Sequence, residues 1–243
     1  MQQKLRVPAL VFYLVGLVFM GAGVPLMIKT QLGVTVISSF PYSIWLITST
    51  LTTGMWITII QCAVLVGAIL LLKRLTVSMV ASFITAYLLG LFVDIFTVVW
   101  APLVFEALWL KLTMVVVSSA IMAFGAGLTV YSKYPPIPDL VFLRDVAKAK
   151  NMGLTKLKLM MDGAFFAMTV TLTLVFLGRI DGVGVGTVIS VSMVGYIVGQ
   201  TNKLAEKLFT TTHFASEEKE TAFFEFNLLS VFKPKPKELE DEA

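Results

Sequence analysis

Residues 21–29 read GAGVPLMIK, and residues 125–133 read GAGLTVYSK. Both stretches close a long apolar run, and both end in a lysine, Lys29 in the first and Lys133 in the second, at an offset of 104 residues. Further matches follow at an offset of 105 residues, namely Ile84 with Ile189, Gly90 with Gly195 and Val93 with Val198. These matches predict a duplicated chain. The predicted organisation is a first membrane repeat at 1–104, a second at 105–202 and a charged tail at 203–243.

The composition is unusually apolar. Of the 243 residues, 57% are hydrophobic and 14% are charged, and the mean hydropathy is +0.88. Soluble domains average about 45–50% apolar and about 25% charged residues, so a soluble globule of this composition would expose large apolar patches. A transmembrane helix needs about 20 predominantly apolar residues. Six runs meet this need and predict an all-α integral membrane protein: 8–28, 55–72, 77–99, 112–131, 159–177 and 183–200.

The basic residues are concentrated between these runs. The net charge of +4 divides into +7 over residues 1–201 and −3 over 202–243. Cytoplasmic loops of membrane proteins collect Lys and Arg, and placing the N-terminus inside puts 16 of the 19 basic residues on the inner side. This pattern predicts a multi-pass protein of the cell (inner) membrane with cytoplasmic N- and C-termini. The first run is expected to remain as an uncleaved anchor.

Residues 34–51 are a candidate for a seventh span, because residues 30–72 carry no charge. A full span there would move the basic segment 132–158 to the outer side, against the same charge rule. We therefore expect a re-entrant or irregular segment, in keeping with Pro41 and the hydroxyl-bearing residues around it. Segments 30–53 and 132–156 then occupy matching positions, each after the first helix of its repeat.

Three spans per repeat is an odd number, so the second repeat must enter the membrane from the opposite side. Inverted three-helix repeats are a recurring plan of secondary transporters, whose substrate sites lie where broken helices meet near the midplane. Duplicated helical bundles also serve as inert scaffolds, and this alternative stays open.

Several motifs resemble those of one family. They are the Gly-rich residues 21–34 ending MIKTQLGV, the segment GLFVD at 90–94, Pro138-Asp139, Asp162, and GVGT at 184–187. In their order and spacing they resemble the YczE/YyaS/YitT family of bacterial integral membrane proteins, closest to its YczE-like branch. Residues 36–38, Val-Ile-Ser, stand where that family usually shows Pro-Trp-Asp. The resemblance implies a multi-span inner-membrane protein, sometimes described as a transporter, with no settled substrate.

Ionisable residues inside a membrane are costly and tend to be functional. Asp94 is the sharpest candidate for a proton relay or a cation site, although pairing with Lys29 or Arg179 would also account for it. Asp162 is expected to pair with Lys158 or Arg144 near the inner interface. Gln61 lies deep in its run and needs a hydrogen-bond partner there. The candidate substrate or ion pathway comprises Asp94, Gln61, Lys29, Lys133, Asp139 and Asp162.

Other chemistries find little support in the sequence. One histidine, His213, and one cysteine, Cys62, cannot form a disulfide within the chain or a His/Cys metal site. The glycines at 178–186 lack the preceding strand of a dinucleotide-binding fold. We therefore expect no cofactor, no metal and no catalytic residues. A membrane enzyme would need Asp94, Asp139 and Asp162 to converge.

The leading hypothesis is a secondary transporter or exporter of a small molecule. The alternative is a non-transporting accessory or scaffold protein that docks a partner through the loop 132–158 or the tail. Within the tail, residues 221–232 are apolar enough to lie on a bilayer or to bind a partner. The expected partners are the lipid bilayer, a small-molecule substrate and a coupling ion; a homo-oligomer is left open, and nucleic acid is not expected.

Overall fold

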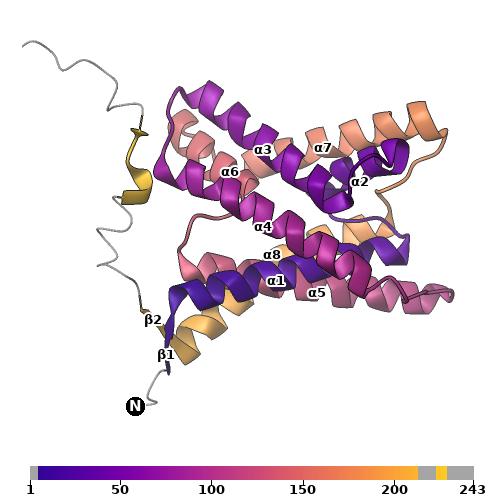
Figure 1. The fold of residues 1–243 in the computed structure, drawn as a ribbon, viewed down its shortest axis with the longest axis horizontal. Helices are drawn as coiled ribbons and strands as arrows, with labels where there is room; N and C mark the ends of the chain where they lie inside the picture. The colour runs from indigo at the N-terminus through magenta and orange to yellow at the C-terminus, as the bar shows by residue number, and fades with distance from the viewer. Residues whose placement is uncertain (1–4, 213–222, 229–243) are drawn as a thin grey trace, which may run out of the picture.

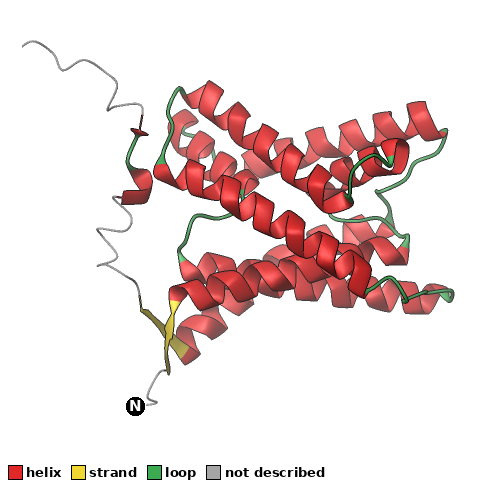
Figure 2. Ribbon diagram, in the orientation of Figure 1, coloured by secondary structure: helices red, strands yellow, loops and turns green. Residues whose placement is uncertain are grey.

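The computed structural model describes residues 5–212 and 223–228, and within these the chain is almost entirely helical (Figures 1 and 2). The eight helices are α1 Ala9–Thr30, α2 Val36–Thr48, α3 Thr53–Leu72, α4 Val77–Val99, α5 Leu108–Ser132, α6 Pro138–Lys150, α7 Leu154–Leu177 and α8 Val185–Leu208. Two short strands, β1 Leu5–Pro8 and β2 Phe209–Thr212, pair in parallel and join the two ends of the helical region.

Five of the described helices are long and apolar enough to cross a membrane, namely α1, α3, α4, α5 and α7. Each covers one of the predicted runs. The sixth predicted run corresponds to α8, which is a 24-residue helix but is less apolar. Its second half carries Gln200, Asn202, Lys203 and Glu206. The charged and amide side chains of α8 are therefore confined to its second half.

The two segments predicted to be re-entrant or irregular each contain a short helix. α2 and α6 have 13 residues each, which corresponds to about 20 Å of helix, too short to cross a hydrocarbon core of about 30 Å. α6 begins with Pro138, a residue suited to the first helical position because its missing N–H has no helical partner there. The helix order is thus long, short, long, long, and then the same again.

Helices α1 and α5 pack closely along their middles. A Cβ atom added to Gly16 would lie 2.7 Å from the Gly125 carbonyl oxygen, and one added to Gly23 would lie 2.8 Å from the Ser118 carbonyl oxygen. The absence of side chains on these glycines allows the two backbones to approach. Because the contacts run in opposite order along the two helices, α1 and α5 are antiparallel.

Some contacts between α1 and α5 interchange under a single shift in residue number. A shift of 102 residues converts the pair Gly16–Gly125 into the pair Ser118–Gly23. The same shift relates the left-handed C-cap of α1, Gln31, to that of α5, Lys133. Lys29 lies in the last helical turn of α1, whereas Lys133 lies just beyond α5, and the predicted equivalence of the two lysines stays a prediction.

The helices form two groups with α4 crossing between them (Figure 1). One group contains α1, α5 and α8; the other contains α2, α3, α6 and α7, in which α2 packs on α7 and α6 packs on α3. One contact is not matched between the halves: α3 packs along α4, whereas α7 hardly touches α8. Helices α7 and α8 therefore lie largely apart.

Part of the predicted tail docks on the helical bundle itself. The backbone N–H of Val77 donates to the Phe226 carbonyl oxygen at 3.2 Å, and that of Leu228 donates to the Leu75 carbonyl oxygen at 2.7 Å. The Asn227 side chain accepts from the Leu75 N–H at 3.2 Å. Residues 223–228 therefore lie against the connection between α3 and α4. The first tail residues, 203–212, complete α8 and form β2. Residues 213–222 and 229–243, including His213, lie outside the described part of the chain.

Candidate functional site

A cavity of about 350 Å³ lies between the two helix groups and is lined by residues from all eight helices. The first turns of both short helices face it: residues 35–38 at the start of α2 and residues 137–140 at the start of α6. Most of its wall is apolar. The polar exceptions among the lining residues are Thr35, Ser38, Gln61, Asp139, Lys158, Asp162 and Ser190.

Asp139 is the most deeply buried charged residue of this cavity, with 4% of its surface exposed. Its backbone N–H donates to Oε1 of Gln61 at 3.1 Å, so that α3 caps the start of α6. Its Oδ1 atom is buried and has no hydrogen-bond partner among the described residues. Burial raises the pKa of Asp139 to about 6, although the positive charge of Lys158 and nearby hydrogen-bond donors oppose the rise.

Lys158 and Asp162 form an ion pair across one turn of α7, with Nζ 3.1 Å from Oδ2. The predicted pairing of Asp162 is thereby confirmed. Both residues line the central cavity and also a second, wider cavity of about 740 Å³. Val130, Leu140 and Val191 are shared in the same way, so the two cavities are neighbours with a common wall.

The wider cavity, here called the vestibule, opens among basic residues. Its wall includes Lys133, Arg144 and Lys158, and the docked tail contributes Phe224 and Glu225. It lies at the C-terminal end of α5 and the N-terminal end of α7. The central cavity is thus extended toward the face that holds the loop 132–158.

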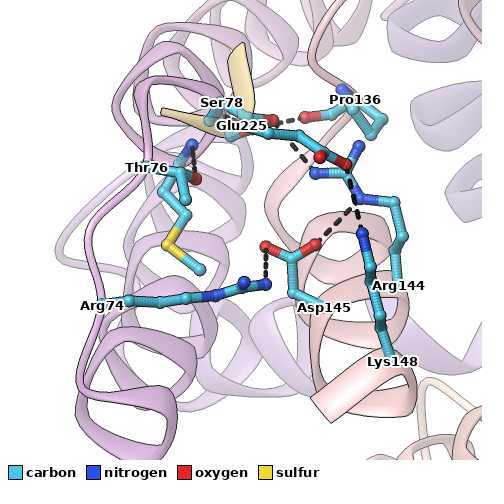
Figure 3. A network of polar contacts seen from close by, with 10 residues as sticks. Arg74, Thr76, Ser78, Pro136, Arg144, Asp145, Lys148 and Glu225 are labelled. Atoms are coloured by element: carbon cyan, nitrogen blue, oxygen red, sulfur yellow. Dashed lines mark hydrogen bonds and ion pairs between the residues drawn. The ribbon is translucent and has the colours of Figure 1, made fainter. Parts of the chain in front are cut away.

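A polar network holds the tail at this face (Figure 3). The buried carboxylate of Asp145 pairs with Arg74 at 3.2 Å and with Arg144 at 2.9 Å. Lys148 pairs with Glu225 of the tail at 3.5 Å. The network joins the connection between α3 and α4 to α6 and to the tail. Sequence reasoning missed Asp145, because nothing in its own segment distinguishes it from a solvated loop carboxylate.

Beyond the C-terminal end of α7, residues 31–35 and 182–187 hydrogen-bond to each other. This contact, here called the seam, lies at the end of α7 opposite the vestibule. The Gly186 N–H donates to the Leu32 carbonyl oxygen at 2.8 Å, and the Val34 N–H donates to the Gly182 carbonyl oxygen at 2.9 Å. Gly33 has a φ of +98°, and a Cβ atom there would lie 2.5 Å from the Gly184 nitrogen. Only glycine suits that backbone angle at such a close approach.

Asp94 does not line either cavity. Its Oδ2 accepts from the Thr52 hydroxyl at 2.6 Å, and its Oδ1 accepts from the Gly54 N–H at 2.8 Å. It therefore caps the positively polarised N-terminus of α3. Neither predicted ionic partner contacts it: Lys29 donates to the Ala101 carbonyl oxygen, and Arg179 pairs with Asp181.

Of the six predicted site residues, the structure brings three together around the central cavity: Gln61, Asp139 and Asp162. Lys133 lines the vestibule. Asp94 and Lys29 lie apart from both cavities. The sequence predicted Lys158 only as an ion-pair partner of Asp162. Its place in the cavity wall depends on the packing of α7, which the sequence does not show.

The fold and the cavity together define a helical protein with several helices able to cross a membrane and a buried carboxyl group in its interior. Residues 7–203 match a family of unknown function, DUF6198, and the chain belongs to this family. Searches of curated proteins and of solved structures find no match to the chain. The finer resemblance to the YczE-like branch stays a prediction.

Proposed function

We propose that this chain is a small secondary transporter that moves a small molecule through its central cavity. In this proposal α8 is the sixth span, and the membrane domain consists of two inverted three-helix repeats. The observation that carries the proposal is the cavity between the first turns of α2 and α6, the two short helices in matching positions. Transporters with inverted repeats bind substrate where such broken helices meet.

The antiparallel packing of α1 against α5 supports the inverted repeat. The contact of Gly16 with Gly125 has a counterpart in the contact of Ser118 with Gly23, in which the two helices exchange roles. Such paired contacts are expected for two helices related by a two-fold axis. The packing of α2 on α7 mirrors that of α6 on α3. If both halves had the same orientation in the membrane, the equivalent helices α1 and α5 would be parallel.

The charge distribution supports a vestibule that faces the cytoplasm. Lys133, Arg144 and Lys158 line it, and Arg74 and Lys148 belong to the neighbouring polar network; cytoplasmic segments are the ones enriched in such residues. The seam of residues 31–35 and 182–187 then closes the outer side. One closed end and one open end correspond to an inward-open state of an alternating-access cycle.

The competing function is a scaffold that docks a partner through the loop or the tail. The cavity favours transport over this alternative, because an inert bundle has no need of a buried carboxyl group beside an unfilled interior. In addition, the described part of the tail is engaged by the bundle itself.

The test is a ligand screen on the purified full chain followed by flux measurements. We expect at least one compound in a panel of amines, amino acids, carboxylates and nucleosides to raise the Tm, and that compound to show counterflow in liposomes. Val194→Trp fills the central cavity and is expected to reduce flux at least tenfold. Val188→Trp is the matched control, because Val188 lies on the same helix, is 68% exposed and lines neither cavity.

Failure of every compound to stabilise the protein or to undergo counterflow would contradict transport. Equal flux through the Val194→Trp and Val188→Trp variants would contradict passage through this cavity. A partner that copurifies with the chain and is lost with the loop 132–158, in the absence of flux, would favour the scaffold.

A further inference from the structure

We propose that the carboxylate of Asp139 binds the charged group of an amphipathic organic cation, and that a proton competes with this cation for the same site. The inference rests on the proposed transport function and assigns its substrate class and coupling ion. It places proton coupling at Asp139 rather than at Asp94.

The geometry of Asp139 distinguishes it from the other charged residues of the cavity. Lys158 and Asp162 neutralise each other as a pair. Asp139 has no ion-pair partner within hydrogen-bonding distance among the described residues, and its Oδ1 is left without a hydrogen bond. When ionised, it leaves the cavity wall with one uncompensated negative charge. A buried charge of this kind requires a counter-charge or neutralisation by a proton.

The groups that face Asp139 are few. α3 contributes the uncharged Gln61, and α7 contributes Lys158 and Asp162; the other elements contribute uncharged side chains to the described cavity wall. The shift of the Asp139 pKa to about 6 agrees with a site that gains and loses its proton near neutral pH. Its place in the first turn of α6 favours the ionised form, because the helix N-terminus is positively polarised.

The remainder of the cavity suits an apolar body. Val24, Ile57, Val93, Met122, Phe165 and Val194 form much of its wall. A volume of about 350 Å³ is in the range of small-molecule sites. A compound with one positive charge and a compact hydrocarbon or aromatic body satisfies both features.

The exchange is balanced in charge and protons. The protonated carboxyl of Asp139 releases one proton to the vestibule as the substrate cation binds to the resulting carboxylate. After the outer seam opens, a proton from the outside reprotonates the carboxylate and displaces the cation. One proton enters for each cation exported, and the only covalent bond broken or formed is the carboxyl O–H bond.

The experiment measures binding of benzyltrimethylammonium and tetraphenylphosphonium to the purified full chain by calorimetry between pH 5 and pH 8. These ions carry a permanent charge, so any proton released on binding comes from the protein. We expect affinity to fall about tenfold per pH unit below the pKa of Asp139. Up to one proton per bound cation is expected below that pKa, measured from buffers of different ionisation enthalpy.

Asp139→Asn is expected to bind these cations at least tenfold more weakly at pH 8 and without pH dependence. Asp94→Asn is the matched control and is expected to retain both the affinity and the pH dependence. The wild-type proton release decides the question even if Asp139→Asn does not fold. Absence of binding by either cation at pH 8, or binding that strengthens as the pH falls, would overturn the inference; the second result would indicate an anionic ligand.

Failure of the inference can be separated from failure of the proposed function. Cation binding with proton release but no flux in liposomes would contradict transport and leave the site intact. Flux of a metabolite that is unchanged in Asp139→Asn would contradict the role of Asp139 and leave transport intact.

Discussion

The Oε1 atom of Gln61 accepts a 3.1 Å hydrogen bond from the backbone N–H of Asp139, joining the middle of α3 to the first turn of α6. The two residues are 78 positions apart in the chain. Gln61 thereby satisfies one of the N–H groups that a helix start leaves without a partner. The contact holds the Asp139 backbone where its carboxyl group meets the central cavity.

Replacing this acceptor should destabilise the protein. Gln61→Met leaves the Asp139 N–H buried without its partner, which we expect to cost about 1–3 kcal/mol and to lower the Tm of the purified chain. Gln200→Met is the control, because Gln200 is exposed on α8. Equal Tm values for the two variants would show that the hydrogen bond adds no stability.

The raised pKa of Asp139 predicts a pH-dependent effect on stability. The folded protein holds this proton up to about pH 6, whereas the carboxyl group ordinarily loses it near pH 3.8. Wild-type stability should therefore fall as the pH rises from about 4 to above 6, because ionisation in the folded state is costly. Asp139→Asn removes this cost and should be more stable than wild type at pH 8, by about 2–3 kcal/mol.

Thermal unfolding of both proteins from pH 4 to pH 8 measures this difference. The advantage of the variant should disappear at pH 4, where the wild-type carboxyl is protonated in the folded protein. A constant difference across the range would indicate that the substitution acts through packing and not through ionisation.

The cap that Asp94 provides for α3 predicts coupled substitutions. Asp94→Ala and Thr52→Ala each remove part of the same cap, and we expect each to cost about 1–2 kcal/mol of stability. Because the two side chains contact each other, their effects should not add in the double variant. A double-mutant cycle of unfolding free energies measures the coupling, and strict additivity would exclude it.

In the proposed topology the seam closes the outer side of the central cavity, and this closure should depend on Gly33. Gly33→Ala introduces a methyl group at a φ of +98° and against the Gly184 nitrogen, so the seam should loosen and expose the cavity from the outer side. In a Cys62→Ala background, Ser38→Cys should then react faster with a membrane-impermeant thiol reagent added outside. Gly67→Ala, where a Cβ atom meets open space and lines neither cavity, should leave the rate unchanged.

The docked tail predicts a difference between two truncations. Deleting 216–243 removes Phe224 and Glu225 from the vestibule wall, whereas deleting 229–243 leaves them in place. In the proposed topology and in a Cys62→Ala background, labelling of Thr155→Cys from the cytoplasmic side should be faster in the first truncation and unchanged in the second. Ligand-dependent stabilisation should survive both truncations, and its loss in both would favour a docking role for the tail.

Much of the helical layout could be predicted from the sequence. The run at 77–99 forms α4 with the predicted bounds, and the other five runs each lie mostly within one helix. Such runs can be recognised in the sequence because length and apolar content are properties of a segment by itself. The sixth run, 183–200, continues into a longer helix, α8, whose second half carries Gln200, Asn202, Lys203 and Glu206.

The surroundings of each carboxyl group could not be predicted in this way. Asp94 stands out in its apolar run, yet Thr52 and Gly54 satisfy it from the start of another helix. Asp139 looks like an ordinary turn residue beside Pro138, yet it is buried at the cavity. What surrounds a charge depends on the segments packed against it, and those are distant in the chain.

The sequence by itself determined that the chain forms long apolar helices, because hydropathy and helix length are encoded within each segment. Only the tertiary structure decided that α2 and α6 direct their first turns toward one cavity, that a glycine seam closes one end, and that Asp139 rather than Asp94 meets the interior. Burial and hydrogen bonding arise from long-range packing, and these determine the chemistry of a carboxyl group.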